Sequence, residues 1–255
     1  MNKFFLDFLD KINIKKNDIL YIASNITLIL LLHKKLKEKF DPNDLIDYFY
    51  ERVGANGTLL FPTFNWSFCR GIPFNYYTTP SETGALTKIA LARKDFVRTK
   101  HPIYSFVVKG RDQEMLYNLD DESGWGSNSI FSYFHQNAAK NLFIGIDYKN
   151  GFTFDHYFEE KIGVDYRYFK YFEGEYTDRN KKIKIKRYKM YVRDLGKNVE
   201  TYVSEKMDDV LIINKGYQKL FYENIYFGLI DMKIAGDIME QDIKNKGGLI
   251  FAKSI

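Results

Sequence analysis

The sequence alternates between short apolar segments and segments with helical spacing, and this alternation constrains the fold more than any other feature. The segment DILYIAS predicts a buried strand, and LIDYFYERV has the apolar spacing of a helix that stops at Gly54. The following GTLLFPTF predicts a second strand. Strand, helix and strand in this order are typical of a sheet with parallel strands and helices packed on it.

The same alternation continues through the middle of the chain. Helical patterns occur at residues 79–92, 129–136 and 153–161, and SFVVKG and NLFIGI predict further strands. From 166 to 192, aromatic and basic residues alternate, which indicates antiparallel strands. We expect a helix around 215–223 and strand-like pieces from there to the end.

These patterns predict one α/β domain over residues 1–255. A chain of 255 residues is long enough for one large core, and its 45% hydrophobic and 17% aromatic residues are typical of a folded protein. We expect a mainly parallel or mixed central sheet flanked by helices, with antiparallel strands in the C-terminal third. Residues 170–215, approximately, would form a strand-rich subregion of this domain.

Three features predict a cytoplasmic protein. The N-terminal MNKFFLDFLDKINIKKND places acidic residues between apolar ones, unlike a secretory leader. The longest apolar run, residues 26–32, is much shorter than the ~20 residues of a membrane-spanning helix. Cys69 is the only cysteine, so an internal disulfide and a cysteine-based zinc cluster are excluded, in agreement with a reducing compartment.

The formal charge of +5 would suit an anionic partner. Much of the excess lies in KKIKIKRYK, at residues 181–189, where charges alternate with isoleucine. This alternation favours a strand with one solvated face over a nucleic-acid patch. We therefore expect small-molecule substrates and no nucleic-acid partner, and a nucleotide-bearing molecule such as coenzyme A would benefit from the positive field.

Two of the four histidines are poor catalytic candidates. His33 lies in the basic helical segment LLHKKLKEK, where a surface position is expected. His135 comes near the end of a short helical pattern, where a histidine suits the helix dipole.

His156 is a stronger candidate because it follows a strand and a glycine, at the edge of a parallel sheet where ligands bind. Glu159, three residues on, would share a helix face with His156, and its carboxylate would fix the tautomer and raise the basicity of the imidazole. Asp155 and Glu160 are weaker candidates for this orienting role. The spacing alone is equally compatible with a surface His/Glu pair.

The fourth histidine, His101, lies in RTKHPIYSF with Arg98, Thr99 and Ser105. Such a loop suits phosphate or carbonyl oxygens, but a turn with local side-chain hydrogen bonds explains it as well. Cys69 has no base near it in sequence, so we expect a packed thiol and no nucleophile.

Several common motifs are missing: G-x-G-x-x-G, G-x-x-x-x-G-K-[ST], H-E-x-x-H and G-x-S-x-G do not occur. Instead, GTLLFPTFNWSF, TPSETGALTKIALAR, RTKHPIYSFVVKG and TFDHYFEE follow one another in the order and spacing of the aminoglycoside 3-N-acetyltransferase family. The resemblance runs from about Asp18 to Tyr171. It is most similar to the branch that acylates amino groups of nucleotide-linked sugars.

The resemblance implies a single α/β domain, an acyl-coenzyme A donor and no metal. Thr153, His156 and Glu159 fall on the family's T-x-x-H-x-x-E pattern, which implies that His156 is the general base and that Glu159 supports it. The residues that it implies for coenzyme A are Ser24, Asn25, Thr27, Arg98, Thr99, His101 and Ser105.

Acceptor binding is expected in the stretch TFNWSFCRGIPFNYY and beside the base, because aromatic rings stack on sugars and nucleobases. The residues that we assign to it are Thr63, Asn65, Trp66, Phe68, Thr153 and Asp155. Core packing is an alternative for some of these aromatic rings.

One departure from the family bears on the acceptor. The family's first strand typically ends in His-Ser-Ser-Leu-Ser, whereas the segment here reads Ala23-Ser24-Asn25-Ile26-Thr27 and lacks the histidine. With the positive charge, this favours a nucleotide-linked amino sugar over an aminoglycoside antibiotic. The alternatives are an aminoglycoside 3-N-acetyltransferase and a non-catalytic module that binds coenzyme A or a nucleotide. Aromatic-rich surfaces would suit a homodimer.

Overall fold

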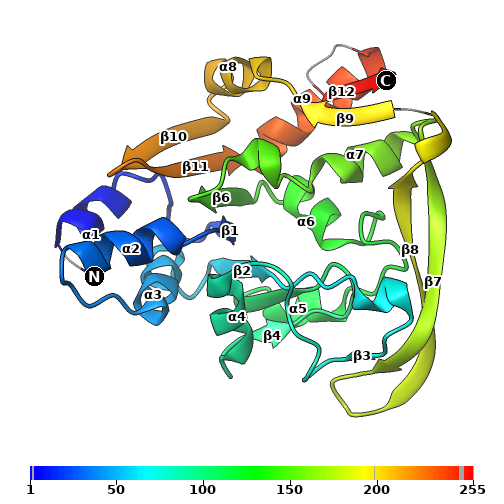
Figure 1. Ribbon diagram of the computed structural model, residues 1–255, viewed down its shortest axis with the longest axis horizontal. Coiled ribbons are helices and arrows are strands. Elements are labelled where there is room, and N and C mark those ends of the chain that lie inside the picture. The colour runs from blue at the N-terminus through cyan, green and yellow to red at the C-terminus, as the bar shows by residue number, and fades with distance from the viewer. Residues whose placement is uncertain (2, 198, 247–249, 255) are drawn as a thin grey trace.

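The computed structural model describes residues 1, 3–197, 199–246 and 250–254. Its centre is a sheet of seven strands (Figure 1). From one edge of the sheet to the other, the strands are β10 (Tyr217–Tyr222), β11 (Ile225–Asp231), β6 (Lys140–Ile144), β1 (Ile19–Ser24), β2 (Thr58–Pro62), β5 (Phe106–Gly110) and β4 (Val97–Arg98). β1 runs parallel to β2 and β6, and the remaining pairs are antiparallel. The sheet is therefore mixed, as the expected α/β class allows.

Helices cover both faces of this sheet, because neighbouring strand residues point to opposite sides. One core cluster joins Leu20 and Ile22 of β1 to four helices. These are α1 (Lys3–Leu9), α2 (Thr27–Lys35), α3 (Pro42–Val53) and α4 (Ala85–Ala92). Tyr21, between them, belongs to the cluster on the other face. That cluster includes buried residues of α5 (Gln113–Asn118), α6 (Ile130–Gln136), α7 (Asp155–Ile162), α8 (Lys206–Ile213) and α9 (Met232–Asn245).

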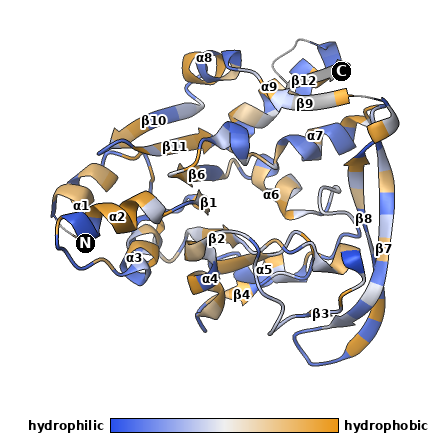
Figure 2. Ribbon diagram, viewed as in Figure 1, coloured by the Kyte–Doolittle hydropathy of each residue, from blue (hydrophilic) through white to orange (hydrophobic). Residues whose placement is uncertain are grey.

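Two smaller sheets lie outside the central one. β7 (Arg167–Thr177) and β8 (Ile183–Arg193) form a long antiparallel hairpin, which β3 (Phe74–Asn75) extends by a short parallel pairing. Hydrophilic and hydrophobic residues alternate along this hairpin (Figure 2). The segment KKIKIKRYK is a strand as expected, but the expectation of a single solvated face is wrong at its start, because Ile183 and Ile185 are 63% and 67% exposed. The second sheet pairs β9 (Val199–Val203) with β12 (Ile250–Ser254). Short 3-10 turns occur at η1 (Ser67–Arg70), η2 (Tyr148–Asn150) and η3 (Leu195–Lys197).

The C-terminal part differs most from expectation. The helix predicted around 215–223 is wrong, because these residues form β10 and pair along their length with β11, while the helix α8 precedes them. The strand-like pieces predicted after it include β11, but α9 replaces most of the rest. Asp231 begins α9 by accepting hydrogen bonds from the backbone N–H groups of Lys233 and Ile234.

Two further predictions need correction. The helix expected at 79–92 begins only at Ala85. His33, expected at the surface, is buried between the rings of Phe5 and Phe40, and its Nδ1 lies 3.0 Å from the carbonyl oxygen of Ile29. In the described part of the chain, no helix combines the length and apolar character needed to cross a membrane.

Candidate active site

The segment between β6 and α7 sets the position of the candidate base. Gly145 follows β6 with φ of +65°, and a Cβ there would meet the carbonyl oxygen of Asn25, so only glycine fits. After η2, buried Phe152 and Phe154 anchor the chain in the core. The helix α7 then begins at Asp155, so its first turn presents His156.

His156 and Glu159 form the pair that their spacing predicts. The Nδ1 of His156 lies 2.7 Å from Oε2 of Glu159, whose side chain is 0% exposed, whereas the imidazole is 25% exposed. The Tyr166 hydroxyl donates to the other carboxylate oxygen at 3.0 Å. Burial alone would raise the pKa of Glu159, but the hydrogen bond from His156 and the charge of Arg167 hold it below its ordinary value.

This contact fixes the tautomer of the base. An ionised carboxylate only accepts hydrogen bonds, so Nδ1 of His156 carries the proton and Nε2 keeps its lone pair. Burial would lower the pKa of His156, but the charge of Asp155 and the contact with Glu159 raise it above its ordinary value. A basic Nε2 on a partly exposed ring is what a general base needs.

The imidazole opens onto a pocket of about 260 Å³. Its lining combines the turn before α7 with β9: Lys149, Asn150, Gly151, Phe152, Thr153, Asp155, His156, Tyr202 and Val203. Thr153 and Asp155, expected to bind the acceptor, thus lie beside the base. Asp155 also accepts a hydrogen bond from the backbone N–H of His156 at 2.8 Å, and burial raises its pKa.

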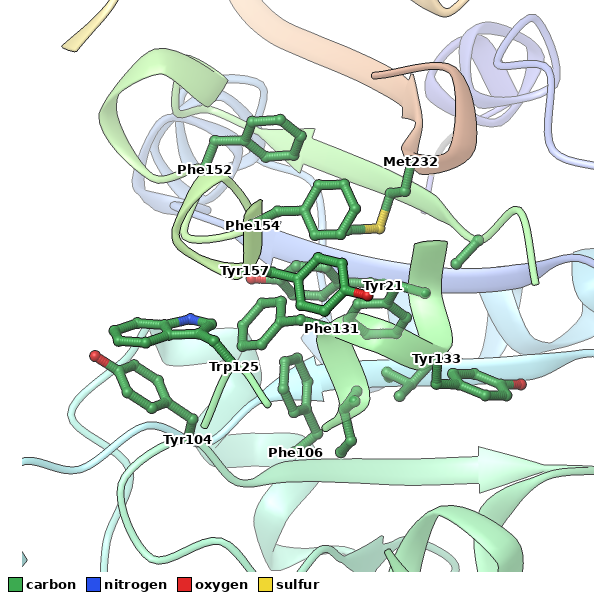
Figure 3. Packing of buried hydrophobic residues seen from close by; sticks show 14 of the residues in the cluster. Tyr21, Tyr104, Phe106, Trp125, Phe131, Tyr133, Phe152, Phe154, Tyr157 and Met232 are labelled. Carbon is green, nitrogen blue, oxygen red and sulfur yellow. The ribbon is translucent and has the colours of Figure 1, made fainter. Parts of the chain in front are cut away.

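An aromatic wall supports the base from the other side. The ring of Trp125 meets the His156 imidazole edge-on, with centroids 5.0 Å apart, and Tyr104 packs on Trp125 at 4.6 Å. Figure 3 shows Trp125 and Tyr104 at one end of the buried aromatic cluster. This packing limits rotation of the imidazole.

Part of the predicted coenzyme A set lies near the same sheet edge. Ser24 ends β1 next to Ile144 of β6, and the N–H of Asn25 donates to the Ile144 carbonyl at 2.7 Å. Asn25 and Thr27 are exposed, and the Ser24 hydroxyl has no hydrogen-bond partner among the described residues. These three residues therefore remain candidates for donor binding.

The other predicted donor residues are used inside the protein. Arg98 is 2% exposed and donates to Ser105 Oγ and to backbone carbonyls, while Thr99 Oγ1 accepts from the Phe106 N–H at 2.9 Å. The Nδ1 of His101 accepts the backbone N–H groups of Ile103 and Tyr104, and burial lowers its pKa to about 3. This arrangement favours a structural role for these four residues over contact with coenzyme A.

The predicted acceptor stretch divides in the same way. Thr63, Asn65 and Phe68 are buried, and the two polar side chains hydrogen-bond to Ser105 and to the Pro80 carbonyl. Trp66 is only partly buried. Cys69 is packed against Met190 as expected, and burial raises the pKa of its thiol to about 11.

The structure adds residues that sequence reasoning missed. Trp125, Tyr166, Arg167 and Tyr202 surround the His156–Glu159 pair or its pocket. No local pattern links Trp125 or Tyr202 to α7. For Tyr166 and Arg167, the nearest signal is Gly163, whose φ of +74° ends α7 and turns the chain back toward it.

Comparison with known proteins assigns the chain to a family. The family model described as aminoglycoside 3-N-acetyltransferase matches residues 34–216, which include the whole His156 motif. The chain belongs to the aminoglycoside 3-N-acetyltransferase family. It is accordingly an acyl-coenzyme A-dependent N-acyltransferase, with acyl-coenzyme A as co-substrate.

Solved structures share the fold of this family member over nearly the whole chain. Aminoglycoside acetyltransferase AAC(3)-Xa superimposes with a TM-score of 0.75 at 15% identity, over 94% of this chain and 90% of that one. The structure titled "AAC-IIIb binary with CoASH" gives 0.74 at 14% identity, over 93% and 94%. The YokD protein from Bacillus subtilis gives 0.72 at 18% identity, over 94% and 96%. A search of curated proteins by sequence finds no match.

Among the described residues, no cluster of three or more His, Cys, Asp or Glu side chains has the arrangement of a metal site.

Proposed function

We propose that this enzyme transfers the acyl group of acyl-coenzyme A to an amino group of an aminoglycoside-type amino sugar, with Nε2 of His156 as the general base. The observation that carries the proposal is the 2.7 Å contact between Nδ1 of His156 and buried Glu159. In the neutral ring it places the proton on Nδ1 and the lone pair on Nε2, and this ring lines a pocket. The same pair is what the family's histidine motif requires.

The proton transfers follow from this geometry. The nitrogen of the neutral amine attacks the thioester carbonyl while Nε2 takes one of its two protons, and a carbon–nitrogen bond forms. The carbon–sulfur bond then breaks, and the imidazolium returns the proton to the leaving sulfur. Glu159 stabilises the imidazolium between these steps, as a carboxylate does for a protonated histidine. Backbone N–H groups near Ser24 and Asn25 are expected to stabilise the oxyanion, but the Asn25 N–H already donates to the Ile144 carbonyl. The Ser24 hydroxyl, which has no hydrogen-bond partner among the described residues, is therefore our candidate donor.

The choice of acceptor follows the family. The matched family model and the related acetyltransferase structures support an aminoglycoside-type acceptor better than the nucleotide-linked sugar expected from charge. Asp155 and Glu159 lie beside His156, so the immediate surroundings of the base carry carboxylates despite the positive net charge. Carboxylates near the base suit an acceptor that arrives as a cation.

A nucleotide-linked amino sugar is the second candidate, and one groove favours it. This groove, of about 630 Å³, lies between Trp66 and the β7–β8 hairpin and includes Tyr168, Lys170 and Arg193. Neither Lys170 nor Arg193 forms an ion pair with a described residue. Two cations without an ion pair, beside the exposed ring of Tyr168, suit a phosphate joined to a base, although Asp194 lines the same groove.

A free-thiol release assay tests both candidates. Acetyl-coenzyme A and longer or hydroxylated acyl donors would be paired with a panel of aminoglycosides and amino-sugar nucleotides, with His156→Ala as the control. Release that needs an aminoglycoside supports the first candidate, and release that needs a nucleotide sugar supports the second. Donor binding by calorimetry without release from any pair would favour a non-catalytic module.

A further inference from the structure

Arg167 contacts the catalytic pair from a different element. It is the first residue of β7, its side chain is 7% exposed, and its Nε lies 2.8 Å from Oε2 of Glu159. That oxygen is the one that faces Nδ1 of His156. One buried carboxylate oxygen thus lies within ion-pair distance of a guanidinium and an imidazole, although Nε of Arg167 is not aligned for a hydrogen bond with it.

The guanidinium also lies close to the imidazole itself. Nη2 of Arg167 is 3.1 Å from Nδ1 of His156. Both atoms are donors once Nδ1 donates to Glu159, so this approach brings a positive charge to the ring without a hydrogen bond. Placing a cation there disfavours the imidazolium.

We propose that Arg167 is a positioning residue, which holds the Glu159 carboxylate beside Nδ1 of His156 and opposes protonation of the imidazole. This inference rests on the proposed role of His156 as base. It assigns to the β7–β8 hairpin a part in catalysis, since Arg167 reaches the base from there.

The balance of charges around the ring explains the need for a cation. From α7, Asp155 and Glu159 face the imidazole, and both favour its protonated form. Opposite them, Arg167 is the cation in contact, while Lys149 in the same pocket is paired with Glu205 and Asp208. Other titratable groups nearby, among the described residues, include the hydroxyls of Tyr104, Tyr166, Tyr191 and Tyr202. Without Arg167, the two carboxylates would favour the imidazolium, which is unable to act as base, more strongly.

The hairpin fixes the guanidinium in place. Nη1 of Arg167 donates to the backbone carbonyl of Tyr191 at 3.1 Å, across the β7–β8 pair. Tyr191 in turn donates through its hydroxyl to the carbonyl of Val164, just beyond α7. The strand pair and the helix are thereby joined around the base, so the guanidinium has little freedom to leave Glu159.

Arg167→Gln tests the proposal by two measurements. We expect kcat to fall roughly ten- to hundredfold through loss of positioning. The acid limb of the pH–rate profile should move about one pH unit or more upward, because the removed cation no longer opposes protonation of His156. Titration of the His156 ring by NMR should show the same upward movement without any substrate. Its signal is assigned by its loss in His156→Asn.

Two further variants separate positioning from stability. Arg167→Lys keeps the charge and loses the planar fork, so the acid limb should stay while the plateau falls. If Arg167→Gln does not fold, Arg167→Lys alone tests the proposal. Arg187→Gln is the matched control, since Arg187 pairs with Glu122 on the exposed side of the same hairpin, and its profile should equal the wild type.

The outcomes are distinct. A folded Arg167→Gln protein whose His156 titration and pH profile match the wild type overturns the proposal, as does a fully active Arg167→Lys. If the wild-type protein transfers no acyl group while His156 still titrates as described, the proposed function fails and the electrostatic role of Arg167 stands.

Discussion

Oε2 of Glu159 lies 2.7 Å from Nδ1 of His156, although the Glu159 side chain has no exposed surface. A carboxylate buried this deeply stays ionised only when cations and hydrogen-bond donors surround it. His156, Tyr166 and Arg167 supply them. The pair is therefore a built site, and the alternative of a surface His/Glu contact is not what the structure shows.

Removing the base should abolish most turnover. His156→Asn lacks an accepting Nε2, so we expect kcat to fall by a factor on the order of 10² or more, with the affinity for acyl-coenzyme A nearly unchanged. Thiol release measures kcat, and calorimetry measures the affinity for acyl-coenzyme A. His33→Gln is the control, since His33 is a buried histidine of α2 that packs against Phe5 and Phe40. This variant should lower the thermal stability and leave kcat unchanged. Full activity of His156→Asn would refute its assignment as base.

Glu159→Gln should move the pH–rate profile in the direction opposite to Arg167→Gln. The carboxylate raises the pKa of His156, so its removal lets the ring lose its proton at lower pH, and the acid limb moves down. We expect a loss in kcat of about tenfold, smaller than that of the base variant. An unmoved acid limb would remove Glu159 from its supporting role.

Glu159 should also make stability depend on acid. Its pKa is lowered in the folded protein, so its contribution is fully present above the ordinary carboxyl pKa and is lost as pH falls through the folded value. At neutral pH, Glu159→Gln leaves Arg167 buried without a partner charge and should cost about 3–5 kcal/mol. Urea unfolding at about pH 5 and about pH 3 would show this difference shrink. His156 is protonated at both values, so a constant difference would contradict the prediction.

Gly236→Ala should destabilise the packing of α9 on α6 and α7. A Cβ at this position would lie 2.6 Å from Cδ2 of His135 and 2.6 Å from Cζ of Phe158. Both are parts of buried rings, so we expect a loss of about 1–3 kcal/mol in the free energy of unfolding. Urea titration measures it, and Lys244→Ala, at an exposed position of α9, should change it by less than about 0.5 kcal/mol. Equal stability of Gly236→Ala and wild type would contradict the prediction, because it would show that α9 can move away from α6 and α7 at no cost in free energy.

The local patterns of the sequence determined much of the fold. Strands such as β1 and β2 are short apolar segments, and α3 has an Asp41 cap, apolar spacing and a terminal glycine, so each is encoded by neighbouring residues. The C-terminal part was predicted poorly because β10 depends on pairing with β11, which no local pattern specifies. The donor-binding assignment of Arg98 and His101 stays a prediction. The sequence did not show that Arg98 is buried, since a polar loop has the same sequence whether it is solvated or enclosed.

By itself, the sequence determined the alternating α/β elements, the His156–Glu159 pair and the family motif, because each depends on residues a few positions apart or on ordered segments. Only the tertiary structure decided which groups surround that pair. Arg167 approaches from a strand beyond the end of α7, and Trp125 from a loop before α6. Their charge and packing act through space over a few ångströms. The chain places them beside His156 only when the β7–β8 hairpin has formed and the helices have packed on the sheet.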